Sequence, residues 1–139
     1  MILDFEKIIP TSNQVRDLYE LLLDRKTSIS HNGIPSQKEH NRFVLSHPYI
    51  AWYLIYKSEK LSGSLYVHSD NSIGLNINQL TKEDVSEIIT FTKANHQPLP
   101  FIKSVRRGEF FINVASDNGD LIKYLQKLGK EEIQRSFVV

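Results

Sequence analysis

Cysteine is absent from the 139 residues, and so is any apolar run of the roughly 20 residues needed to cross a bilayer. Without cysteine the chain has no disulfide, no thiolate metal site and no cysteine nucleophile. That absence fits a reducing compartment. The N-terminal segment MILDFEKIIP also lacks the basic and then apolar layout of a secretion signal. We therefore expect a cytoplasmic protein that does not associate with membranes.

The chain also lacks an excess of charge of one sign. It has 17 Lys and Arg against 16 Asp and Glu, a net charge of +1, which provides no basic footprint for nucleic acid. The five histidines have no metal-ligand spacing such as His-Glu-x-x-His, so no metal site is expected. Neither a nucleophile elbow nor a Walker-type phosphate loop is present. No linker or repeat divides the sequence, which predicts one domain over residues 1–139.

Hydrophobic patterns predict six strands and four helices. The strands are expected at residues 2–9, 50–56, 61–67, 73–77, 109–114 and 132–139, with a short strand piece at 101–102. The run IAWYLIY is apolar throughout, which is typical of a central strand buried on both faces. The next two strands alternate apolar and polar residues, as expected where one face is wetter.

Capping residues mark where the helices begin and end. Thr11 and Ser36 each stand three residues before a Gln or Glu, which is the spacing of a capping box. These boxes predict one helix that runs to about Lys26 and a second that ends before Pro48. Thr81 and Asn118 are the expected N-caps of the third and fourth helices, and Gly129 is placed to end the fourth.

The expected order is strand, two helices, three strands, helix, strand, helix, strand. A meander of strands followed by strand–helix alternation gives a mixed, mostly antiparallel sheet with helices on both faces. The fold class is therefore α/β, in the broader sense α+β.

Particular residues resemble those of the GNAT family of acetyl-CoA-dependent N-acetyltransferases. The segment FINVASDN at 111–118, followed by a helix that ends in Leu128-Gly129, is similar to the family's late strand, turn and helix. The early runs HNRFV at 40–44 and PYIAWYLI at 48–55 are similar to the branch that acetylates amino groups on nucleotide-linked sugars. Gly74 matches a common small residue in the third meander strand.

This resemblance implies a site between two splaying parallel strands, at residues 73–78 and 109–114. Acetyl-CoA would lie between them, and a primary amine would attack its thioester. The strand residues Leu75, Asn76 and Ile77 would hold the pantetheine arm. The other residues expected near the cofactor are Gln79, Asn113 and Asn118, although Asn118 also has a structural role as an N-cap.

Two histidines are candidates for the base that the reaction needs, because imidazole titrates near neutral pH. His31 and His40 flank the first turn of the second helix, where the family usually admits its acceptor. The family's acid is often a Tyr on the last helix. Leu125 stands at the matching position, and Tyr124, one residue earlier, is the candidate to reach the thioester.

The family's phosphate loop is altered in this sequence. At Gln79–Asp84 the Gln is present, both glycines are missing, and two acids, Glu83 and Asp84, stand where a pyrophosphate would bind. The main hypothesis is an N-acetyltransferase acting on a small primary amine such as an amino sugar. The alternatives are a catalytically silent GNAT-like binding or interaction domain, and an acyltransferase with another thioester donor. Exposed strand edges are compatible with a homodimer.

Overall fold

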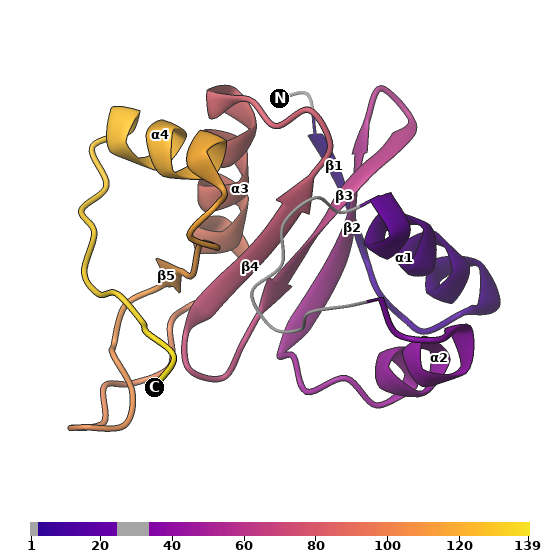
Figure 1. Ribbon diagram of the computed structural model, residues 1–139, viewed down its shortest axis with the longest axis horizontal. Helices are drawn as coiled ribbons and strands as arrows, with labels where there is room; N and C mark the ends of the chain where they lie inside the picture. Colours follow the sequence, from indigo (N-terminus) through magenta and orange to yellow (C-terminus); the bar gives the residue numbers. More distant parts are fainter. Residues whose placement is uncertain (1–2, 25–33) are drawn as a thin grey trace.

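The structure is a computed structural model that describes residues 3–24 and 34–139. Within these two ranges, five strands and four helices follow one another in the order expected up to the fourth helix (Figure 1). The strands are β1 (Leu3–Lys7), β2 (Ala51–Lys57), β3 (Lys60–Val67), β4 (Ser72–Ile77) and β5 (Phe111–Ile112). The helices are α1 (Ser12–Asp24), α2 (Gln37–Leu45), α3 (Lys82–Asn95) and α4 (Gly119–Lys127).

The strands form one mixed sheet in the order β1-β2-β3-β4-β5. The first four pair antiparallel as a meander, and β5 joins β4 as a parallel neighbour. Residues 51–55 of β2 are all buried, because this strand lies between two partners and is covered on both faces. The expectation of a mostly antiparallel α+β sheet is therefore confirmed.

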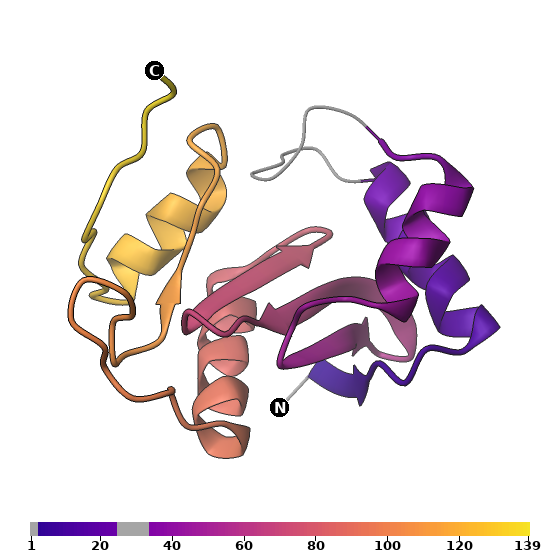
Figure 2. The ribbon, with the colours of Figure 1, turned by 90° about the horizontal axis from the view of Figure 1, so that it is seen from below.

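Helices cover both faces of the sheet, and each face has its own apolar core. On one face α1 and α2 contribute Leu18, Leu21 and Val44, which pack with Trp52 and Leu54. On the other face Ile88 of α3 packs with a row of strand residues (Leu3, Tyr53, Ile55, Leu65, Ile73 and Ile77). Figure 2 shows α1 and α2 on one side of the sheet, with α3 and α4 on the other.

The helix starts agree with the capping residues read from the sequence. Ser36 and Thr81 each form a complete capping box, with Glu39 and Asp84 respectively. The Asn118 side chain accepts the Leu121 N–H, and Gly129 has a left-handed φ of 75°. No helix in the described ranges is long and apolar enough to span a membrane.

Gln14 departs from the expected capping box of α1. Its Oε1 accepts the N–H of Ile9, while its Nε2 donates to Glu6 and to the carbonyl of Lys7. Only half of the box forms, with Thr11 accepting the Gln14 N–H at 3.2 Å. The buried Gln14 side chain therefore ties α1 to the end of β1.

Three strand predictions near the C-terminus are wrong in extent or existence. The expected strand at 109–114 is reduced to β5, because only two of its residues pair with β4. The expected piece at 101–102 is a tight turn in which Ile102 bridges Arg106. Residues 132–139 are exposed and form no strand, since no backbone in the described part of the chain pairs with them. Periodicity indicates that a segment can form a strand, but a partner is needed to realise it.

Candidate functional site

The parallel pairing of β4 and β5 ends abruptly. The two strands pair at Ser72↔Phe111 and Ile73↔Ile112, and at no later position within the described residues. β4 continues to Ile77, whereas the chain after β5 turns toward α4 in a different direction (Figure 2). From Gly74 to Ile77, the side of β4 opposite β3 has no partner among the described strands. We call this stretch the open edge of β4.

The backbone of the open edge offers hydrogen-bonding groups at alternate residues. The carbonyl of Ser72 accepts the His68 N–H, and the Asn78 N–H donates to the carbonyl of Ser62. The backbone N–H and C=O groups of the even-numbered residues of β4 therefore point toward β3. Backbone groups alternate along a strand, and Leu75 and Ile77 therefore direct their N–H and C=O groups away from β3. Asn76 directs its backbone toward β3. Of the three expected pantetheine-binding residues, two have their backbone groups at the open edge.

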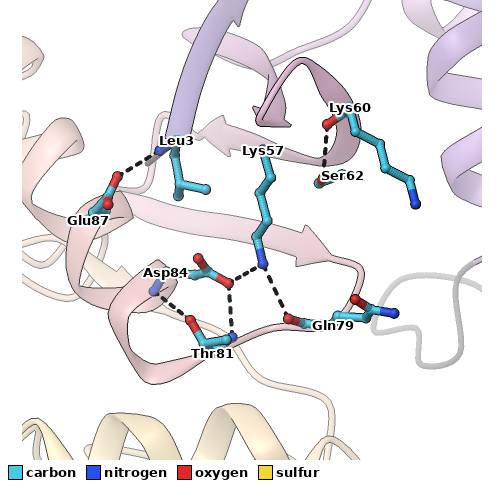
Figure 3. Close-up of polar contacts among 8 residues, drawn as sticks. All are labelled: Leu3, Lys57, Lys60, Ser62, Gln79, Thr81, Asp84 and Glu87. Carbon is cyan, nitrogen blue, oxygen red and sulfur yellow. Dashed lines mark hydrogen bonds and ion pairs between the residues drawn. The ribbon is translucent and has the colours of Figure 1, made fainter. Parts of the chain in front are cut away.

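The start of α3 is occupied by a carboxylate of the chain itself (Figure 3). Asp84 Oδ2 accepts the Thr81 N–H at 2.9 Å and forms an ion pair with Lys57 Nζ. The Asp84 N–H in turn donates to Thr81 Oγ1 at 3.1 Å. Asp84 is 8% exposed in its side chain and Lys57 is 24% exposed, so the pair is shielded from bulk water. A carboxylate here complements the helix dipole.

The connection between β4 and α3 is short and closed by the same lysine. Only residues 78–81 join the two elements, and Gln79 adopts a left-handed φ of 53° without being glycine. Its carbonyl accepts from Lys57 Nζ at 3.2 Å, while its side chain points away from Asp84 (Figure 3). The Gln79 side chain is thus separate from the Lys57–Asp84 pair. A pyrophosphate at this helix end would meet Asp84 first.

The two histidines proposed as bases lie in different situations. His31 falls outside the described residues and stays a prediction. His40 is 6% exposed, and its Nε2 donates to the Val15 carbonyl at 3.0 Å. Burial lowers the pKa of His40, which favours the neutral ring. These contacts connect α2 to α1, and a catalytic role for His40 also stays a prediction.

The late candidates surround β5 and α4. Asn113 directly follows β5 and is exposed, with its Oδ1 accepting from Gln134 at 3.5 Å. Asn118 caps α4, and Tyr124 is half-buried on the same helix. Their cofactor and acid roles stay predictions. In the two described ranges no three His, Asp or Glu side chains gather closely enough to hold a metal ion.

Asn71 organises the end of β3 and the start of β5, and the sequence analysis missed it. It is 1% exposed with a left-handed φ of 73°. Its carbonyl accepts the Phe111 N–H at 3.2 Å, so it fixes where β5 meets β4. The available signal was its position in the turn Ser69-Asp70-Asn71-Ser72, because Asn adopts the left-handed region more readily than most residues.

An aromatic cluster, comprising Phe43, His47, Tyr49, Trp52, Tyr66 and His68, covers the α1–α2 face beside the open edge. The rings of Tyr49 and Tyr66 stack with centroids 4.1 Å apart and an interplanar angle of 13°. Tyr66 lies directly against Gly74, where an added Cβ would stand 1.9 Å from the ring. Gly74 is the first residue of β4 beyond the last pair with β5, so the cluster reaches the point where the strands part.

The fold class follows from comparison with solved structures, not from comparison of sequences. No family model and no curated protein matches the sequence. Solved structures do match, and several are N-acetyltransferases of the GNAT type, which align with 91–100% of this chain. The chain therefore has the GNAT fold, as the residues at 111–118 led us to expect.

Three of the matching structures illustrate the likeness. A domain from Methanocaldococcus jannaschii has a TM-score of 0.65 at 13% identity, covering 96% of this chain and 91% of that one. The Campylobacter jejuni N-acetyltransferase PseH in complex with acetyl coenzyme A has a TM-score of 0.59 at 12% identity, covering 97% and 92%. AAC(6')-Iy in complex with a bisubstrate analogue, CoA-S-monomethyl-acetylneamine, has a TM-score of 0.59 at 11% identity, covering 100% and 97%.

Proposed function

We propose that this chain is an N-acetyltransferase that moves an acetyl group from acetyl-CoA to a small primary amine, such as an amino sugar. The observation that carries this proposal is the parting of β4 and β5 after two parallel pairs. The backbone groups of Leu75 and Ile77 then face an edge that no described strand fills. A pantetheine arm contains two amides, and it can add to such an edge much as a peptide strand does.

The reaction requires few groups from the protein. The amine nitrogen attacks the thioester carbonyl, the new C–N bond forms, and the C–S bond breaks to release the CoA thiolate. A base takes one proton from the amine, and the thiolate takes up another. His31 and His40 are proposed for the base and Tyr124 for the acid, with Asn113 and Asn118 near the cofactor. These assignments follow from the resemblance to the GNAT family.

The two ends of acetyl-CoA fit this chain unequally. The open edge of β4 suits the pantetheine arm, whereas the start of α3 carries Asp84 in place of close-approaching glycines. We therefore expect the pyrophosphate to add little affinity. S-acetylpantetheine, which lacks the pyrophosphate and nucleotide, should bind within about tenfold of acetyl-CoA, a difference of ~1.4 kcal/mol or less.

Binding and turnover can both be measured directly. At free acetyl-CoA a hundredfold above Kd, the free energy of unfolding should rise by about 2.7 kcal/mol. Because the chain has no cysteine, release of CoA thiol can be followed with a thiol-reactive chromogen without background from the protein. Acetyl transfer to at least one member of a panel of amino sugars, aminoglycosides and peptide N-termini is the expected result. Acetyl-CoA binding without any transfer would contradict the proposal.

The second candidate is a catalytically silent GNAT-like binding domain, and the capped start of α3 favours it. Thr81 and Asp84 satisfy each other's N–H groups there, and Lys57 neutralises the carboxylate. Such a helix end is complete without a ligand. Absence of turnover with every amine and both thioesters would support this alternative, and turnover with S-acetylpantetheine alone would indicate a different thioester donor.

Three broader expectations accompany the proposal. We propose that residues 1–139 act as one domain and that the protein works in the cytoplasm, consistent with its lack of cysteine. A homodimer is proposed because exposed apolar side chains gather in the segment 101–105 and at 137–139. Light scattering at two protein concentrations tests the last point.

A further inference from the structure

His68 and Asp70 lie side by side at the end of β3. His68 Nδ1 lies 3.5 Å from Asp70 Oδ1, and the same oxygen accepts the Ser72 N–H at 2.7 Å. Burial acts to raise the pKa of Asp70, but hydrogen bonding from Ser72 and the nearby His68 outweigh it and hold the pKa below its usual range. The carboxylate is thus charged at neutral pH and fixed beside the imidazole.

The ring of His68 has one buried edge and one exposed edge. Nδ1 is shielded from solvent and makes no hydrogen bond to any described residue, yet the side chain as a whole is 34% exposed. The exposed edge is therefore the one that carries Nε2. In the tautomer that carries its proton on Nδ1, which lies 3.5 Å from Asp70 Oδ1, the ring offers the Nε2 lone pair to a molecule outside.

The pair lies on the path toward the open edge of β4. The ring centroid of Tyr49 is 6.0 Å from that of His68, and Tyr49 stacks on Tyr66. Tyr66 in turn lies against Gly74, where β4 and β5 part. The groups that face His68 are Asp70 and Tyr49, and the ring of His47 lies 5.5 Å from that of Tyr49 between centroids.

We propose that His68, positioned by Asp70, is the base that takes the proton from the acceptor amine, and that Tyr49 and Tyr66 form the wall against which this acceptor packs. The inference rests on the acetyl transfer proposed above. The amine proton passes to Nε2 as the C–N bond forms, and the C–S bond breaks with its electron pair on the CoA sulfur. The imidazolium is stabilised by Asp70 until it returns the proton to water. The acceptor class is a primary amine whose ammonium form is attracted by the carboxylate and by aromatic faces.

The test uses the full chain, acetyl-CoA and whichever amine of the panel gives the fastest thiol release. His68→Asn keeps a donor near the position of Nδ1 and removes the titrating Nε2. General-base removal should lower kcat/KM for the amine about 10²–10⁴-fold, with little change in KM for acetyl-CoA. His96→Gln is the matched control, because His96 bonds the Tyr53 hydroxyl at 2.8 Å on the α3 face, away from this cluster. Its kcat/KM should stay within about twofold of wild type, as expected for a change remote from the reacting atoms.

The pH dependence separates catalysis from a structural effect. In wild type, kcat/KM should rise with pH along a limb set by the imidazole, whereas in His68→Asn that limb should vanish and activity should follow the ionisation of the amine alone. Asp70→Asn retains an oxygen for the Ser72 N–H and removes the charge, so it should lower kcat/KM for the amine while the imidazole remains in place. If His68→Asn folds poorly, Asp70→Asn still tests the pair, because it leaves the imidazole in place.

Each outcome decides a different point. Wild-type kcat/KM and an unchanged pH limb in His68→Asn overturn the role of His68 and leave the acetyl transfer standing. A loss in His68→Asn equal to that in His96→Gln, with no change in the limb, does the same. Failure of the wild-type chain to acetylate any amine overturns the proposed function, and the inference with it.

Discussion

The side chain of Asn71 hydrogen-bonds both backbone groups of Leu99. Nδ2 donates to the Leu99 carbonyl at 2.9 Å, and Oδ1 accepts the Leu99 N–H at 2.7 Å. The same Nδ2 donates to the Arg107 carbonyl at 2.6 Å. One buried amide therefore links Leu99 and Arg107 within the segment between α3 and β5, and the Asn71 backbone fixes the first residue of β5. The position of β5, and with it the open edge of β4, depends on this residue.

Replacing Asn71 by Ala should destabilise the protein by about 2–4 kcal/mol, because three backbone groups lose their partner in a buried place and Ala is strained at a left-handed φ. The measurement is urea unfolding followed by circular dichroism. Asn71→Gly removes the strain but not the lost hydrogen bonds, so it should recover only about 1 kcal/mol of that loss.

Asn95→Ala is the matched control, since that exposed side chain makes one hydrogen bond to its own helix at Phe91. It should change stability by no more than about 0.5 kcal/mol. Equal losses in the Asn71 and Asn95 variants would show that the buried amide does not hold the segment in place.

The Lys57–Asp84 ion pair should weaken the binding of acetyl-CoA. Asp84→Asn preserves a capping side chain at the start of α3, removes the negative charge and releases the Lys57 ammonium. Acetyl-CoA should therefore bind about tenfold more tightly, or by ~1.4 kcal/mol, at low salt. The gain should shrink at high salt, where charge interactions are screened. Isothermal titration calorimetry provides the measurement.

Glu83→Gln is the control for this effect. Glu83 is exposed in the first turn of the same helix and has no ion pair with a described residue. Its neutralisation changes the net charge equally but should leave acetyl-CoA affinity within about twofold, because an exposed charge contributes little. Weaker binding by Asp84→Asn than by wild type would refute the idea that the carboxylate opposes the pyrophosphate.

Because His40 is buried, we expect the free energy of unfolding to fall in mild acid. Burial lowers the pKa of His40, so its contribution to stability is fully present above the unfolded value near 6.5 and is lost as pH falls below it. His40→Gln retains a donor for the Val15 carbonyl and does not titrate. The difference in unfolding free energy between about pH 7.5 and about pH 5.5 should therefore be smaller in this variant than in wild type.

Some acid sensitivity should remain in His40→Gln, because burial also lowers the pKa values of His47 and His96. Chemical denaturation at both pH values measures the two slopes. A slope in His40→Gln as steep as in wild type would mean that His40 is not protonated on unfolding in this range.

Local signals in the sequence predicted the framework correctly. Ser36 with Glu39, Thr81 with Asp84, and Asn118 each define a helix start with residues only three positions apart. The apolar run at 50–56 likewise identified the central strand from its own composition. Such signals act within one turn or one strand, so they need no knowledge of the fold.

The errors and omissions concern contacts between distant segments. Residues 132–139 were expected to form a strand but find no partner in the described chain, and β5 pairs at only two positions. Asn71 meets Leu99 from 28 residues away, and Lys57 meets Asp84 only because β2 ends beside the start of α3. The family resemblance located the parting strands, whereas the groups that line them became visible only in three dimensions.

The close approach of Tyr66 to Gly74 restricts how this chain can diverge. Any side chain at 74 would occupy the volume of the phenol ring, since its Cβ would fall 1.9 Å from that ring. Sequences descended from a common ancestor with this one should therefore lose the glycine only where position 66 has become small. Paired substitution at positions 66 and 74 among related sequences would therefore record the contact between the Tyr66 ring and Gly74.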